Sequence, residues 1–369
     1  MRDEGKPKAH RVVAPDSSNE SPAVSEFDFI SRIKRRAEAS CAGKIDGLVH
    51  GIGDDAAVIN VRGKLDSVIT ADLLVEDIDF RRTSLPQDIS YKALAVSLSD
   101  IAAMGARPRF ALLSLGLPQD IWDSPFAVSL SEGFLRSARE FGVTLIGGDV
   151  SRTPERIVID SVVIGETRRG RAVLRSGARA GDQIFVTGTL GGAAAGLKLL
   201  EHARTLRTRA ARTRFLSGLE SLTRRQTRPT PRVECGALLG ERHLASAMID
   251  LSDGLSSDLA HLCERSGVGA LVEAARIPIP PTLKRAGAIN SNSFTRALKD
   301  DALRLALDGG EDFELLFTVR ARDAARLPTR LGGMRLTCIG EVRERGEGIK
   351  ISRDGRVEIL MPSGFDHFK

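Results

Sequence analysis

Aromatic residues are scarce in this chain, at 4% of 369 residues, and no long apolar run is present. None approaches the roughly 18 residues that a membrane-spanning helix requires. Residues 1–25 are polar and lack the apolar core of a secretory signal. We therefore expect no membrane association and a disordered tail over residues 1–25. The apolar content is mainly Ala, Val, Leu and Ile, as is typical of helices packed on sheets.

Cysteine and histidine are also few. The four cysteines lie far apart without a CxxC pair, which argues against a zinc site or a disulfide framework. It favours a reducing compartment, so we expect a cytoplasmic protein. The six histidines form no HExxH motif. Any bound metal should therefore be a hard cation with oxygen ligands.

Positive charge exceeds negative by 6, and nine arginines lie between Arg204 and Arg232. This stretch has a single aromatic residue, Phe215, which is too few to stack a run of nucleic-acid bases. We interpret it as a solvated helical face or loop, with a phosphate-attracting surface as the alternative. Nucleic-acid binding is not expected from the charge alone.

Strand-like and helix-like segments alternate along both halves, which predicts two α/β domains. A basic, glycine-rich stretch near Gly170 separates them, giving domains over 26–168 and 169–369. In the first half we expect helices at 27–42, 88–105 (with Asp88 as N-cap and Gly105 as stop) and 124–142, and strands within 51–60, 66–75, 109–118, 143–149 (ending in a turn) and 156–166. In the second half we expect strands at 182–188, 246–251, 270–274 and 313–319, and helices at 191–200, 256–267 and 296–307.

Aspartates recur beside glycine or at the edges of apolar segments. The positions are Asp54 and Asp55, Asp72, Asp100, Asp149, Asp250 and Asp253, with Glu311 and Asp312 in a sixth segment. Any one of them alone is more typical of a turn or helix cap, but Asp100 lies within an apolar helix, where an unpaired carboxylate is costly. If the set converges, mutual repulsion would favour protonation unless a cation neutralises it. Magnesium with a polyphosphate meets that need.

Familiar kinase motifs are missing. No G-x-x-x-x-G-K-[ST] loop and no HRD or DFG motif occurs. The glycine-rich segment Gly188–Gly196 follows a strand and opens a helix, where it could cradle a phosphate. We favour close strand–helix packing for it.

The motifs taken in order resemble those of the thiamine-monophosphate kinase family. They are GIGDDAAVI, TADLLVE, YKALAVSLSDIAAMGARP, LIGGDVSR, LRSGARAGD, VTGTLGGAAAGL, IDLSDGLSSDL, LDGGEDFELLFTV and GFDHF, from about Glu26 to the C-terminus. The resemblance implies ATP-dependent phosphorylation of thiamine monophosphate to thiamine diphosphate by direct transfer. It also implies the fold of aminoimidazole-ribonucleotide synthetase: two α/β domains, the second with a mixed sheet and helices, and a homodimer in which N-terminal sheets pair near the nucleotide.

The resemblance also assigns residues by motif position. The implied magnesium ligands are Asp55, Thr70, Asp72, Asp100, Asp149, Asp250 and Asp253. The implied ATP contacts are Gly148, Asp149, Arg175 and Ser252, and the implied substrate contacts are Asp79, Glu311 and Phe365. No general base is assigned, because the attacking phosphate oxygen is already ionised and phosphoryl transfer depends on positioning and charge neutralisation.

Two positions depart from the family pattern. Asp79 stands where the family usually has a substrate-contacting histidine, and Ala71 replaces a hydroxyl residue beside a metal ligand. Other interpretations therefore stay open: another ATP-consuming synthetase of the superfamily, such as selenophosphate synthetase or the purine-pathway enzyme, or a non-catalytic nucleotide sensor. Selenophosphate synthetase usually needs a reactive cysteine near a glycine-rich strand, and Cys41 is in a helix-end context.

Overall fold

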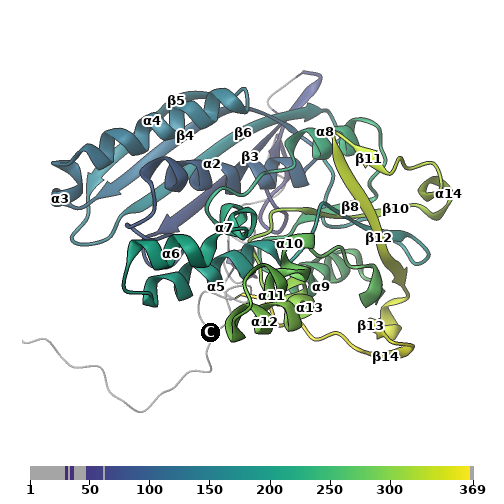
Figure 1. The fold of residues 1–369 in the computed structure, drawn as a ribbon. Coiled ribbons are helices and arrows are strands. Elements are labelled where there is room, and N and C mark those ends of the chain that lie inside the picture. Colours follow the sequence, from purple (N-terminus) through teal and green to yellow (C-terminus); the bar gives the residue numbers. More distant parts are fainter. Residues whose placement is uncertain (1–29, 32–33, 37–46, 61–62, 366–369) are drawn as a thin grey trace, which may run out of the picture.

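The structure is a computed structural model, and it contains two β-sheets with helices packed on them (Figure 1). It describes residues 30–31, 34–36, 47–60 and 63–365. The predicted tail over 1–25 lies outside the described residues, as does most of the predicted helix over 27–42. No helix in the described ranges is both long and apolar enough to cross a membrane.

The first sheet is built from the first half of the chain, in the order β1-β2-β3-β6-β4-β5. Neighbouring strands are antiparallel except β4 and β5, which run parallel. Helices α2 and α4 cover one face of this sheet (Figure 1). Its elements are β1 (Leu48–His50), β2 (Ala57–Ile59), β3 (Leu65–Val75), α2 (Pro86–Ala103), β4 (Arg107–Leu117), α3 (Gln119–Trp122), α4 (Pro125–Glu140), β5 (Thr144–Arg152) and β6 (Val158–Arg168).

Helix α2 is buried along most of its length, between the first sheet and the second half of the chain. The predicted helix is confirmed, and Gly105 follows its end with a φ of +65°, a conformation that favours glycine. The predicted N-cap is wrong. Leu85 occupies that place and Pro86 starts the helix, while Asp88 lies in the first turn and pairs with Arg228.

Strand β5 is longer than predicted. It runs through Asp149 to Arg152 without the expected turn, because its backbone stays paired with β4 to the end. At Gly148 a Cβ atom would lie 1.8 Å from the carbonyl oxygen of Leu113, so only glycine allows this approach.

The second sheet belongs to the second half, in the order β14-β13-β9-β12-β7-β10-β8, with β11 paired to β12. The predicted helix over 296–307 is two helices that meet at Asp301. The first elements are β7 (Gln183–Thr187), α5 (Gly192–Thr205), α6 (Arg209–Leu216), α7 (Glu220–Thr227), α8 (Val233–Glu241), β8 (Ala247–Asp250), α9 (Leu255–Ser266) and β9 (Gly269–Glu273). The others are η1 (Ala274–Arg276), α10 (Pro281–Lys284), α11 (Ala286–Ile289), α12 (Ser293–Asp300), α13 (Ala302–Asp308), β10 (Leu315–Val319), α14 (Ala321–Ala324), β11 (Arg330–Leu331), β12 (Met334–Arg343), η2 (Arg345–Glu347), β13 (Ile349–Arg353) and β14 (Arg356–Ile359).

The face of the first sheet that points away from α2 carries a group of apolar side chains, and we call it the outer face. The strand register aligns its side chains in rows across β3, β6 and β4. Leu73 is 60% exposed, and the rest are partly exposed. The residues are Ile69, Leu73, Phe110, Leu112, Val162 and Ile164. An apolar sheet face of this kind is typical of a surface that is buried by another layer.

Candidate functional site

Three carboxylates from different elements meet between the two sheets. Asp55 precedes β2, Asp100 lies in the last turns of α2, and Asp250 ends β8. One carboxylate oxygen from each lies within 4.8 Å of the others. The two halves of the chain therefore build this group jointly, and its members were all among the predicted ligands.

Hydrogen-bond donors surround the three carboxylates. The hydroxyl of Thr70 donates to Asp100 Oδ2 at 2.5 Å, and Ser99 donates to Asp250 Oδ2 at 2.7 Å. The guanidinium of Arg175 lies 2.6 Å from Asp55 Oδ1. One arginine cannot neutralise three ionised carboxylates, so full ionisation of the group requires a further cation.

Burial changes the acidity of these groups. It raises the pKa of Asp250 to about 8, with the charge on Asp55 adding to the effect. It raises the pKa of Asp72, on the neighbouring strand, to about 6. Burial also raises the pKa of Asp100 well above its ordinary value, and Asp72 and Asp250 raise it further. Desolvation and like charge both oppose ionisation here, and a bound cation would remove both penalties.

Two buried oxygens in this region have no hydrogen-bond partner among the described residues. They are Asp55 Oδ2 and Asp72 Oδ2. Buried polar atoms are normally paired, so these unpaired carboxylate oxygens beside other carboxylates are suited to binding a cation. An all-oxygen donor set suits Mg²⁺ better than zinc or a softer metal.

Asp149 and Gly148 are not part of the three-carboxylate group in the monomer. The register of the sheet puts Asp149 in one row with Ser114, Asp160 and Leu73, on the outer face. Asp72 is in the adjacent row, and side chains alternate between faces along a strand. The predicted ligand Asp149 therefore points to the opposite face of the sheet from Asp72.

The loop after β8 gathers the remaining predicted residues. The carbonyl oxygen of Ser252 accepts from the N–H of Glu311 at 2.7 Å, and that of Asp253 accepts from the N–H of Phe365 at 3.1 Å. The Phe365 side chain is 54% exposed. Glu311 has a φ of +59°, an unusual value for a residue with a side chain and one often found at functional sites.

Glu311 lines a pocket together with Asp79, Lys92 and Gln226. The ammonium of Lys92 contacts Glu311 Oε1 and donates to the carbonyl oxygen of Asp79 at 2.8 Å. The Asp79 carboxylate accepts from the N–H of Val75 at 2.7 Å. Asp79, which departs from the family pattern, therefore contacts its own turn with its carboxylate. Its backbone carbonyl accepts from Lys92.

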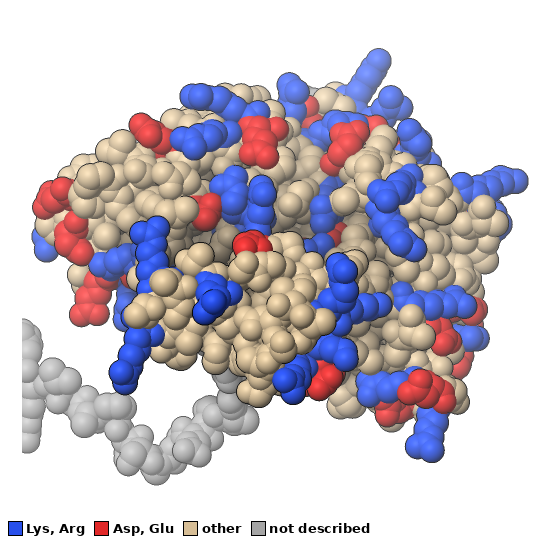
Figure 2. All heavy atoms as spheres, in the orientation of Figure 1, with Lys and Arg blue, Asp and Glu red and all other residues tan. Residues whose placement is uncertain are grey.

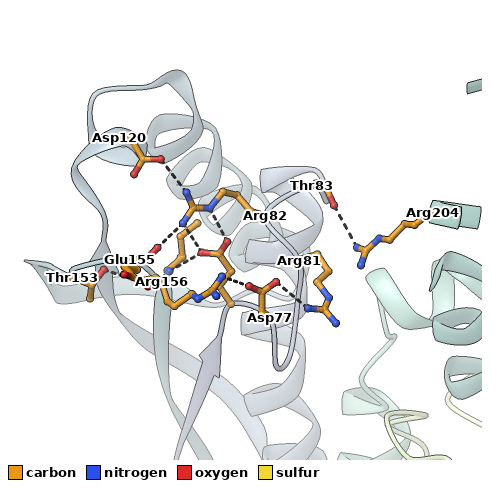
Figure 3. Close-up of polar contacts among 11 residues, drawn as sticks. Asp77, Arg81, Arg82, Thr83, Asp120, Thr153, Glu155, Arg156 and Arg204 are labelled. Carbon is orange, nitrogen blue, oxygen red and sulfur yellow. Dashed lines mark hydrogen bonds and ion pairs between the residues drawn. The ribbon is translucent and has the colours of Figure 1, made fainter. Parts of the chain in front are cut away.

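The turn that carries Asp79 is fixed by ion pairs (Figure 3). The buried Glu76 accepts two hydrogen bonds from Arg82, which also contacts Asp120 and the carbonyl oxygen of Glu155. Asp77 contacts the guanidinium groups of its neighbours Arg81 and Arg156. These contacts hold one wall of the pocket in place.

The arginine-rich stretch is only partly a solvated face. Arg232 donates two hydrogen bonds, of 2.5 and 2.6 Å, to the fully buried Glu314. Arg228 lies 4.0 Å from the ring centroid of Tyr91 and 3.1 Å from Asp88 Oδ1. Figure 2 shows basic side chains spread among acidic and neutral ones on the displayed face. Some arginines of this stretch thus serve internal pairs and do not form a solvated face.

The glycine-rich segment at the start of α5 packs closely against neighbouring elements. Close packing was the interpretation that the sequence analysis favoured. A Cβ atom on Gly196 would lie 2.2 Å from the carbonyl oxygen of Leu222 on α7. The N–H groups of Gly191 and Ala193 donate to the carboxylate of Asp312. An internal carboxylate therefore occupies the helix N-terminus where a phosphate would bind.

The sequence interpretation missed three residues at these sites: Ser99, Lys92 and Gln226. Lys92 had a visible signal, since it is the one charged residue in the apolar run ISYKALAVSL. Gln226 had none, because it lies in the arginine-rich stretch and meets Glu311 only through the fold.

Comparison with known proteins agrees along almost the whole chain. Residues 53–167 match the AIR synthase related protein, N-terminal domain, and residues 179–351 match the corresponding C-terminal domain. Thiamine-monophosphate kinase of Salmonella typhimurium is 39% identical over 94% of this chain and 99% of its own length. The enzyme of Bacillus subtilis is 36% identical over 94% of this chain and 100% of its own length.

Solved structures give the same result. The structure of AaThiL complexed with AMPPCP and TMP has a TM-score of 0.78 at 32% identity, covering 96% of this chain and 100% of that one. Thiamine-monophosphate kinase from Stenotrophomonas maltophilia has a TM-score of 0.68 at 38% identity, covering 90% and 98%. The two-domain α/β fold implied by the resemblance is confirmed, and this chain belongs to the thiamine-monophosphate kinase family.

Proposed function

We propose that this protein transfers the γ-phosphoryl group of ATP to thiamine monophosphate, giving thiamine diphosphate and ADP. The observation that carries the proposal is the buried meeting of Asp55, Asp100 and Asp250 between the two sheets. Relatives that share about two fifths of the sequence are thiamine-monophosphate kinases. A structural relative holds AMPPCP and TMP.

The roles of the side chains follow from their chemistry. Asp55, Asp72, Asp100 and Asp250, with Thr70, would hold Mg²⁺, and Asp253 lies on the adjoining loop. Bound Mg²⁺ would neutralise phosphate charge and orient the phosphates. The guanidinium of Arg175 is placed to donate to phosphate oxygens, since its planar fork matches them. We retain Ser252, Gly148 and Asp149 as ATP contacts.

The pocket beside Glu311 suits the organic end of the substrate. Lys92 is eight residues before Asp100 on α2, so about 12 Å separates them along the helix axis. Transfer requires the substrate phosphate near the aspartates, and an extended thiamine monophosphate would then reach the pocket with its pyrimidine ring. The backbone N–H of Phe365 donates to the carbonyl oxygen of Asp253, and the exposed Phe365 ring would contact the cationic thiazolium ring.

A homodimer formed by the outer faces is part of the proposal. It would bury the apolar rows around Leu73, which are exposed in the single chain. It would also place Asp149 at the interface, next to Gly148 in the strand, and so explain why Asp149 points away from Asp72. Sedimentation velocity should show a dimer, and Leu73→Asp should shift it to monomer. A monomeric wild type would contradict this part.

The activity itself is tested by coupled detection of ADP with thiamine monophosphate and Mg²⁺, with thiamine diphosphate identified by chromatography. We expect ADP release that depends on both substrate and metal. Release that thiamine monophosphate does not stimulate would overturn the proposal. Tight ATP–Mg²⁺ binding by calorimetry without turnover would instead favour a nucleotide sensor, and turnover with another acceptor would favour a related synthetase.

We propose that residues 26–168 and 169–369 are the two domains, which the separate sheets and separate family matches support. We also infer a cytoplasmic location. The described cysteines Cys235, Cys263 and Cys338 are free thiols, which suits a reducing compartment.

A further inference from the structure

Glu311 is held at both of its carboxylate oxygens by residues from different halves of the chain. The ammonium of Lys92, on α2, contacts Oε1. The Nε2 group of Gln226, on α7, donates to Oε2 at 2.5 Å. The Glu311 side chain is still 31% exposed at the pocket. Its position is thus set by two donors while part of the carboxylate stays open to a ligand.

Packing does not explain the amide of Gln226. The residue is only 7% exposed, and its Oε1 is buried without a partner among the described residues. An unpaired buried acceptor costs free energy that an apolar side chain of similar size would avoid. The amide cannot turn round, because Oε1 would then face the Glu311 carboxylate. The structure therefore keeps an unfavourable oxygen in order to present an N–H to Glu311.

We propose that Gln226, together with Lys92, is a positioning residue that holds Glu311 where it reads the amino group of the substrate's pyrimidine ring. The inference rests on the proposed function, which puts the pyrimidine in this pocket. A carboxylate accepts hydrogen bonds and cannot donate them. A fixed Glu311 therefore favours an amino group and disfavours a carbonyl at the same place.

The first test is Gln226→Met, which preserves side-chain size and removes both the N–H and the unpaired oxygen. We expect the KM for thiamine monophosphate to rise about tenfold, the scale of one hydrogen bond to a charged group. The KM for ATP should be unchanged, and the melting temperature should stay the same or rise. A merely structural role would instead lower the melting temperature and disturb both KM values.

The matched control is Gln119→Met, the same change on the exposed helix α3, where the amide contacts only Asp123 among the described side chains. It should behave as wild type. Gln226→Glu is a second variant, which places a carboxylate against Glu311. It should raise the KM for thiamine monophosphate further than the methionine does.

The second readout is substrate discrimination. Thiamine monophosphate is compared with its 4-oxo analogue, oxythiamine monophosphate, by kcat/KM in wild type and in Gln226→Met. The ratio should fall about tenfold in the variant, because a loosened Glu311 no longer rejects the carbonyl. An unchanged ratio and KM in an active enzyme would overturn the positioning role. A wild type without activity on thiamine monophosphate would overturn the proposed function itself.

Discussion

The guanidinium of Arg175 lies 2.6 Å from Oδ1 of Asp55, although 120 residues separate them along the chain. The backbone N–H of the same arginine donates to Oδ1 of Asp54 at 2.7 Å. One residue thus engages two adjacent aspartates in different ways. Asp55 belongs to the three-carboxylate group, and Asp54 binds the backbone beside it.

This difference predicts different outcomes for two conservative variants. Asp55→Asn should lower kcat by two or more orders of magnitude, roughly the effect of losing one electrostatic contact to the transition state. Asp54→Asn keeps an oxygen for the N–H of Arg175 and should retain most of the activity. Asp54→Asn should melt near the wild-type temperature, whereas Asp55→Asn also loses the buried ion pair with Arg175 and should melt lower while still folding. Steady-state ADP release measures the rates, and near-normal turnover of Asp55→Asn would count against the metal group.

Replacing Arg175 should make stability depend strongly on metal. In Arg175→Met the buried Asp55 loses its cation, and breaking such a pair costs about 3–5 kcal/mol. Added Mg²⁺ should recover much of that loss by neutralising the same carboxylates. Thermal melting with and without Mg²⁺ tests this. Equal metal-induced shifts for variant and wild type would contradict it.

Two arginines of the arginine-rich stretch should differ sharply in their contribution to the free energy of unfolding. Arg232→Met leaves the buried Glu314 without its bidentate partner and should cost about 3–5 kcal/mol of unfolding free energy. Arg209→Met, the same change at an exposed position on α6, should cost less than about 0.5 kcal/mol. Urea unfolding gives both values. Similar costs for the two variants would argue against a structural role for the Arg232–Glu314 pair.

His261 on α9 should make the protein less stable in acid. Burial lowers its pKa to about 4, and the charges on Arg175 and Arg265 lower it further. The unfolded chain takes up this proton near pH 6.5 and the folded chain only near pH 4, so unfolding gains a proton in between. Stability is lost as pH falls through that window, by up to roughly 3 kcal/mol.

The variant His261→Gln should remove that part of the pH dependence. Comparing the urea midpoints of variant and wild type at pH 4.5 and pH 7 isolates the histidine from the aspartates, which titrate in both proteins. An identical pH dependence in the two would show that His261 does not contribute.

Several features followed from the sequence because local pattern encodes them. Strand β3, helix α2 and strand β4 were predicted from apolar periodicity, and Gly105 from the need for a positive φ after a helix. Asp100 was singled out because a carboxylate in an apolar helix needs a partner. The ordered motifs were enough to predict the family and its fold.

Only the tertiary structure decided which distant groups meet. The pairs Gln226–Glu311 and Arg232–Glu314 join residues 85 and 82 positions apart, and no local periodicity relates them. The face on which Asp149 lies depends on strand register, where a shift of one residue reverses the side-chain direction. The sequence by itself determined which segments form strands and which carboxylates are candidate ligands. The packing of α2 between two sheets decided which carboxylates share a site, because burial and charge depend on distances that only the fold sets.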